Sequence, residues 1–107
     1  MDGIVGGQRE SPLSPSPVKS RIVLGGINPA AVDTVAAIFM GYDIKKIPII
    51  ARAFDQFKYP LADFGPSDIQ IKSNNRNYSL DEFCADGPRI PFEPSIGWKG
   101  RIEQVKD

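Results

Sequence analysis

The sequence contains no histidine and only one cysteine, Cys84. Without histidine, the chain lacks the commonest general base, the Ser-His-Asp and Cys-His catalytic arrangements and the usual zinc ligands. A single cysteine forms no internal disulfide and cannot hold an iron–sulfur cluster, which usually takes several thiolates. We therefore expect this chain to hold no cofactor by itself, and we interpret Cys84 as a small, partly buried apolar residue.

The sequence also lacks a net charge, because 13 basic side chains balance 13 acidic ones. A neutral chain has no overall attraction to nucleic acid or to an anionic membrane surface. No apolar run approaches the roughly 18 residues that a membrane span requires. The N-terminus has no basic patch followed by an apolar core, the pattern typical of a secretory signal. These absences predict a cytoplasmic protein that binds neither nucleic acid nor a membrane.

The composition is that of an ordinary globular protein, with 41% hydrophobic and 24% charged residues among 107. A chain of this length fits one domain at most. Three prolines and four serines between positions 8 and 20 favour an extended connection. We predict a single partial domain over 1–107. It has a strand end and a flexible Pro/Ser loop over 1–20, an α/β core over 21–72, and a turn and extended tail over 73–107.

The most informative segment combines a short strand, a glycine turn and a helix. Residues 21–24 are rich in β-branched side chains, and Gly25-Gly26 allows a turn with positive φ. Asn28 is a good N-cap and Pro29 suits the first helical position. Gly41 then ends the helix in the left-handed conformation. The segment therefore predicts a helix that begins after Asn28 and ends at Gly41.

This helix is apolar on nearly all sides, since Asp33 and Thr34 are its only polar residues. Such a helix is buried by layers on more than one side. A single short strand cannot cover it, so we expect a larger sheet, a partner chain, or both. We predict an α/β fold with a small, mainly parallel sheet and packed helices, as an incomplete domain with an irregular N-terminal loop and C-terminal tail.

The remaining sequence predicts shorter elements. We expect a helical turn over 43–46, a helix from Pro48 that ends before Tyr59, a strand over 68–72, a turn over 73–77 and one helical turn over 80–83. In the tail, apolar residues alternate with charged and small ones, which predicts a strap packed over a surface; these are Phe92, Ile96, Trp98 and Ile102.

Several motifs recur in the order and spacing of a known family. They are Asp2-Gly3-Ile4-Val5-Gly6-Gly7, Asn28-Pro29-Ala30-Ala31-Val32-Asp33-Thr34-Val35-Ala36-Ala37, Met40-Gly41-Tyr42-Asp43, Lys46-Ile47-Pro48 and a terminal Gly97-Trp98-Lys99-Gly100 that is followed, after one residue, by Ile102-Glu103. Over most of its length the chain thus resembles the C-terminal part of the family called domain of unknown function 362. The resemblance implies a missing N-terminal α/β half as partner. Many members also carry ferredoxin-like cysteine motifs, which this chain lacks.

The first candidate site is the turn at Gly25 and Gly26, with Asn28 at the start of the helix. Free amides and the positive dipole end of a helix attract phosphate or carboxylate, and glycines let a ligand approach the backbone. The alternative is a strand–helix connection with ordinary capping, because these residues form neither a dinucleotide-binding nor a P-loop motif.

The second candidate is Asp33, which lies one turn beyond the cap. It has three possible roles: a structural bond to a neighbouring loop or cation, an acid/base function, or metal ligation. Asp2 is the third candidate, because ligands gather at the carboxyl ends of strands in open α/β sheets. If the two strands are parallel neighbours, Asp2 shares an edge with the glycine turn, and Asp2 with Asp33 offers oxygen ligands for a divalent cation.

Our leading hypothesis is a ligand-binding C-terminal half of a cytoplasmic α/β protein. Its small anionic ligand lies near four residues, namely Gly25, Gly26, Asn28 and Asp33. The alternative is a non-catalytic structural or interaction fragment that pairs with the missing half or with a second copy. A third hypothesis is an enzyme that uses Asp33 together with a metal or redox module on another chain. We do not expect complete catalytic machinery within this chain.

Overall fold

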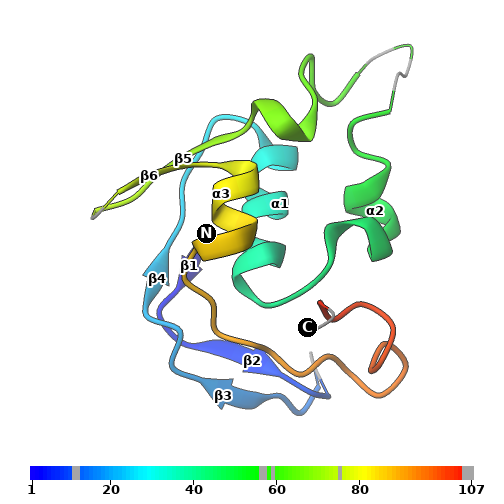
Figure 1. Cartoon of the computed structure of the whole chain (residues 1–107). Coiled ribbons are helices and arrows are strands. Elements are labelled where there is room, and N and C mark those ends of the chain that lie inside the picture. The colour runs from blue at the N-terminus through cyan, green and yellow to red at the C-terminus, as the bar shows by residue number, and fades with distance from the viewer. Residues whose placement is uncertain (11–12, 56–57, 59, 75, 105–107) are drawn as a thin grey trace.

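The computed structural model describes residues 1–10, 13–55, 58, 60–74 and 76–104 (Figure 1). Its helices are α1 (Pro29–Phe39), α2 (Pro48–Ala51) and α3 (Leu80–Asp86), and single 3₁₀ turns form η1 (Ile44–Lys46) and η2 (Pro66–Asp68). Its strands are β1 (Asp2–Gly3), β2 (Gly6–Gln8), β3 (Ser16–Val18), β4 (Ile22–Val23), β5 (Gln70–Lys72) and β6 (Asn77–Ser79). No helix of this part of the chain has the length and apolar character needed to cross a membrane.

The strands form three separate two-stranded ribbons, β1–β4, β2–β3 and β5–β6, and all three are antiparallel. The prediction of a mainly parallel sheet is therefore wrong. Parallel neighbours need a crossover connection, usually a helix. Between β1 and β4 the chain instead folds into the β2–β3 ribbon and returns antiparallel (Figure 1). After α1, β5 pairs with β6 and not with β4.

The local signals around α1 predicted that helix correctly. The Asn28 side chain caps it, Pro29 occupies its first turn, and Gly41 follows its end with a φ of +84°. The turn before the helix differs from the prediction, because neither Gly25 nor Gly26 has a positive φ. The predicted turn at η1 is confirmed as well, with the Asp43 side chain accepting a hydrogen bond from the Lys45 amide.

Other elements depart from the prediction in length or kind. The supposed loop over 8–20 contains β3, and the predicted turn over 73–77 leads directly into β6. The helix α2 is only one turn long, and α3 is longer than the single turn we expected. Part of the predicted second helix, at positions 56 and 57, lies outside the described residues.

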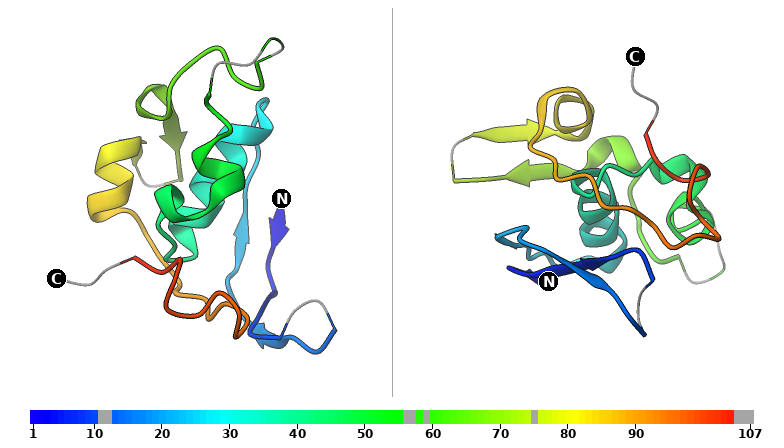
Figure 2. Two further views of the ribbon diagram at one scale, coloured as in Figure 1. Left: turned by 90° about the vertical axis from the view of Figure 1, so that its right-hand side faces the viewer. Right: turned by 90° about the horizontal axis from the view of Figure 1, so that it is seen from below.

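The helix α1 lies between two apolar clusters, which bury its last six residues. The first cluster brings together α1, α3 and the residue before β5, and comprises Val35, Ile38, Phe39, Ile69, Leu80 and Phe83. The second joins α1 to α2 and the tail, and comprises Ala37, Tyr42, Ile50, Phe92 and Ile102. The views in Figure 2 show α1 surrounded by these elements. This chain thus covers the C-terminal half of α1 by itself, contrary to our argument for an outside cover.

The tail after α3 is a strap, as its alternating pattern predicts, but only part of that pattern is buried. The Ile90 and Phe92 amides donate hydrogen bonds to the Phe39 and Met40 carbonyls at the end of α1. Phe92 and Ile102 are buried, whereas Ile96 and Trp98 are 81% and 49% exposed.

The strap also holds the β2–β3 ribbon against the body of the fold. The Arg9 guanidinium pairs with the Glu93 carboxylate, and the Gln8 side chain accepts a hydrogen bond from the Glu93 amide at 3.0 Å. The ribbon therefore has partners that lie far away in the sequence.

Candidate functional site

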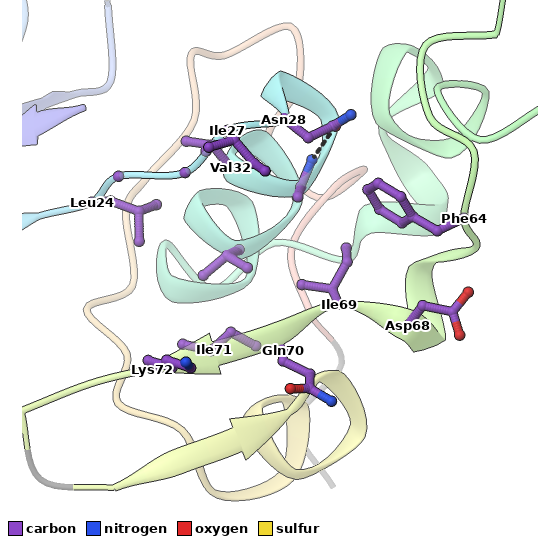
Figure 3. A pocket seen from close by; sticks show the side chains of 14 residues that line it. Leu24, Ile27, Asn28, Val32, Phe64, Asp68, Ile69, Gln70, Ile71 and Lys72 are labelled. Carbon is purple, nitrogen blue, oxygen red and sulfur yellow. Dashed lines mark hydrogen bonds between the residues drawn. The ribbon is translucent and has the colours of Figure 1, made fainter.

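A pocket of about 520 Å³ lies between the turn after β4, the start of α1 and strand β5 (Figure 3). It brings together three residues of the sequence-predicted site, Gly25, Gly26 and Asn28. Most of its lining is apolar, and comprises Leu24, Ile27, Ala31, Val32, Val35, Phe64, Ile69 and Ile71. In Figure 3 the segment from Leu24 to Val32 lies on one side and β5 on the other, with Phe64 at one end.

The aromatic wall is held by a second ring. Phe64 makes an edge-to-face contact with Phe54, with ring centroids 5.9 Å apart. Such pairs are favourable beyond the area that they bury. Phe54 comes from the segment after α2, so this contact ties the wall of the pocket to the part of the chain that covers α1.

The two glycines of the turn have different roles. A Cβ atom built on Gly26 lies 2.8 Å from Val32 Cγ2, whereas one built on Gly25 meets nothing within 4 Å. The absence of a side chain at Gly26 therefore allows the turn to approach α1 closely. The amides of Gly25, Gly26 and Ile27 donate to no acceptor within the described chain.

Both polar atoms of the Asn28 side chain form hydrogen bonds within the fold. Its Oδ1 accepts a hydrogen bond from the Ala31 amide at 3.2 Å, and its Nδ2 donates to the Leu61 carbonyl at 3.1 Å. The Val32 amide bonds to the Asn28 carbonyl, and Pro29 has no N–H. In the first turn of α1 this leaves only the Ala30 amide without an acceptor among the described residues, so the helix end contributes little to anion binding.

Lys72 brings a positive charge to the pocket from β5. Its side chain is exposed, and no carboxylate of the described residues pairs with it. Asp68 also lines the pocket, but Figure 3 shows its carboxylate turned away from α1, and its Oδ2 accepts a hydrogen bond from the Gly65 amide at 3.0 Å. Among the described residues that line the pocket, Lys72 is the one basic side chain.

Asp33 and Asp2 do not join this pocket. Asp33 is exposed on α1, so the buried charge that made it conspicuous in the sequence is not present. Asp2 is also exposed, and its Oδ1 accepts a hydrogen bond from the Ile4 amide at 3.2 Å. Within the described ranges, no three acidic, cysteine or histidine side chains gather in a group that would hold a metal ion.

Cys84 lies on α3 and is exposed, not partly buried as expected. It lines a different pocket, together with Tyr42 and Asp81. Desolvation by its neighbours raises the pKa of the Cys84 thiol, although the nearby Arg89 acts in the opposite direction. A thiol with a raised pKa carries little of the thiolate that reacts as a nucleophile or binds a metal.

Sequence reasoning found the turn of this pocket but missed its opposite wall. The alternation of Ile69 and Ile71 with polar residues indicated a strand. In that pattern Lys72 is only the polar residue that ends the strand. Nothing local to either segment indicates that β5 lies opposite the Gly25-Gly26 turn. Phe64 is part of a stretch that the sequence predicts as a loop, and no local signal distinguishes it.

Comparisons with known proteins gave no match: no family model, no curated protein and no solved structure matches the chain. The resemblance to the domain of unknown function 362 family therefore stays a prediction from the motifs alone.

Proposed function

We propose that this chain is a binding module for a small anionic ligand with an apolar body. The observation that carries the proposal is the meeting of three features in one pocket. The first is the Lys72 ammonium group, which pairs with no carboxylate of the described residues. The others are the backbone amides of Gly25 and Gly26, which donate to no acceptor in that part of the chain, and a wall of aliphatic and aromatic side chains. Ligand pockets commonly combine an apolar lining with a few polar groups that fix orientation.

Each feature has a separate role in this proposal. Lys72 attracts the anion as a flexible point charge, and the glycine amides donate hydrogen bonds to it. Hydrogen bonds to a charged group contribute about 1.5–3 kcal/mol each. The apolar part of the ligand packs against Val32, Val35 and Phe64. Asn28 holds the turn in place, and Asp33 has no role in the pocket.

A titration followed by amide chemical shifts tests this proposal. The probes are sodium hexanoate, phenylacetate and inorganic phosphate, added to uniformly ¹⁵N-labelled protein. We expect hexanoate and phenylacetate to shift the Gly25 and Gly26 amides, and phosphate to bind more weakly because it has no apolar part. Lys72→Gln should weaken binding about tenfold, the loss of one charge-assisted contact.

A matched control is Lys19→Gln, because Lys19 is exposed and does not line this pocket. It should leave the affinity unchanged. The proposal is wrong if none of the three probes shifts the turn amides of the folded protein, or if both lysine variants weaken binding equally.

The second candidate function, an interaction fragment, is favoured by one observation. Four large apolar side chains in and beside the β1–β4 ribbon are exposed, and they are Met1, Ile4, Val5 and Val23. Such residues are suited to pairing with another chain. Light scattering after size exclusion tests this alternative: a mass that stays monomeric across a wide concentration range contradicts self-association. The cytoplasmic location stays a prediction, which fractionation of expressing cells would test.

A further inference from the structure

The proposed pocket continues into a longer groove. A second pocket of about 590 Å³ is lined by residues 20–24 on one side and by residues 71–74 on the other. It shares Leu24, Val35, Ile71 and Lys72 with the first pocket. Together the two form a groove between β4 and β5, which we call the β4–β5 groove. Among the described residues, none from β1 lines it, so it lies on the side of β4 away from β1.

The β4 strand borders this groove with an edge that pairs with no other strand of the described residues. Leu24 exchanges hydrogen bonds with Met1, through the Leu24 amide at 2.9 Å and the Met1 amine at 2.5 Å. In an antiparallel ladder, bonded pairs alternate with pairs whose N–H and C=O groups point outward. Val23, which lies opposite Asp2, belongs to the second kind. Its backbone donor and acceptor therefore point away from β1.

The β5 strand likewise has one edge without a strand partner in the part of the chain that the structure describes. The Ser73 amide donates to the Arg76 carbonyl at 3.2 Å, and Lys72 lies opposite Asn77 as the next pair of the ladder. By the same alternation, the backbone groups of Lys72 and Gln70 point away from β6. The two strands run in opposite directions along the groove. Along β4 the chain passes from the second pocket to the first, whereas along β5 it passes from the first pocket to the second.

We propose that the β4–β5 groove binds the C-terminal end of an extended peptide, with the terminal carboxylate at the Gly25-Gly26 turn and Lys72. This proposal rests on the proposed function, because the carboxylate is its anion and the last side chain is its apolar body. The peptide adds a strand between β4 and β5, antiparallel to β5 and parallel to β4. Strand addition to an exposed edge and capture of a terminal carboxylate by backbone amides are established recognition modes.

Charge and hydrogen-bond complementarity favour a peptide over a free small molecule. A small anion would satisfy Lys72 and the turn amides but leave the backbone groups of Val23 and Gln70 unpaired. Beyond the pocket, Arg21 lines the groove and forms no ion pair within the described chain. It favours an acidic side chain upstream of the peptide's C-terminus, although Asp86 at the same end reduces the net positive charge.

The experiment uses the full chain and a pool of N-acetylated pentapeptides that end in Val, Leu, Ile or Phe. The same pool is made with free C-terminal carboxylates and with C-terminal amides. We expect the free acids to shift the amides of Val23, Gly25, Gly26, Gln70 and Lys72. The amidated pool should bind about tenfold more weakly, the loss expected when a charged hydrogen-bond acceptor becomes neutral. Equal binding of the two pools overturns the proposal.

Two further measurements separate this proposal from the function on which it rests. N-methylation of a peptide residue removes its backbone N–H donor without changing the protein. Methylating one of the two alternate sets, the odd-numbered or the even-numbered peptide residues, should abolish strand pairing, because only one of these two sets donates to a given strand. If neither set weakens binding, the peptide does not pair as a strand and the proposal fails. If hexanoate binds but no free-acid peptide does, the anion site stands and the peptide proposal fails. If neither binds, both fail.

Discussion

Replacing Asn28 tests how the turn of the candidate site is held, because this one side chain makes two hydrogen bonds. Its Oδ1 caps α1 through the Ala31 amide, and its Nδ2 donates to the Leu61 carbonyl in the segment between α2 and η2. Loss of an N-cap costs about 1 kcal/mol, and loss of the second, exposed hydrogen bond costs about 1 kcal/mol more. Asn28→Ala should therefore lower the free energy of unfolding by about 2 kcal/mol.

A serine at this position separates the two contributions. Serine caps helices as well as asparagine does but has no amide to reach Leu61, so Asn28→Ser should cost about 1 kcal/mol. Urea unfolding at constant m-value gives both free-energy differences. The corresponding fall in Tm is about 4–8 °C for each kcal/mol in a domain of this size. Amide exchange should show the Ala31 N–H protected in the serine variant and exposed in the alanine variant.

Two outcomes would refute this account of Asn28. If the alanine and serine variants lose the same stability, the cap contributes nothing. If Asn28→Ala behaves like Asn74→Ala, neither hydrogen bond matters. Asn74 is a suitable control because it is exposed and makes no side-chain hydrogen bond within the described part of the chain. Surface substitutions of this kind usually change stability by less than about 0.5 kcal/mol.

Three further predictions follow from packing and charge. Gly26→Ala should cost about 1 kcal/mol through overpacking against the helix, whereas Gly25→Ala should be neutral or slightly stabilising, and thermal unfolding compares them. Ile38→Ala should cost about 2–5 kcal/mol because that side chain is 1% exposed, whereas Ile49→Ala, at 81% exposed, should cost little; equal losses would contradict the core assignment. Ser79 caps α3, and hydrogen bonds from its hydroxyl and amide lower the pKa of the Glu82 carboxyl. The contribution of Glu82 to stability is therefore present above the ordinary glutamate pKa of about 4.3 and is lost as the pH falls through the lower, folded-state value. Amide shifts of α3 should report this acid transition in the native protein, and Glu82→Gln should remove it.

The part of the fold that the sequence predicts well is the part set by neighbours in the chain. The Asn28-Pro29 start and the Gly41 stop act within one helical turn, and the structure confirms all three. The β2–β3 ribbon depends instead on distant partners. Its strands are rich in glycine, serine and proline, and Gln8 and Arg9 bond to Glu93 in the tail. No local pattern contains that information.

The same distinction applies to sheet direction and to the candidate site. A strand–turn–helix pattern fits either a parallel or an antiparallel neighbour, and only the β2–β3 ribbon determines that β4 returns along β1. The glycine turn was identifiable as a possible anion site because its residues are adjacent. Lys72 was not, because it lies on β5, which lines the side of the pocket opposite the turn.

The burial of α1 by the tail has a consequence for how the chain folds during synthesis. The helix itself can form once its own residues are made, but Phe92 and Ile102 belong to the cluster that covers one of its sides. Until the ribosome has released residue 102, that side of α1 stays exposed to water and to other chains. Exposed apolar surface of this kind makes folding intermediates prone to aggregation. A nascent chain arrested before the tail should therefore bind chaperones, whereas the released chain should not.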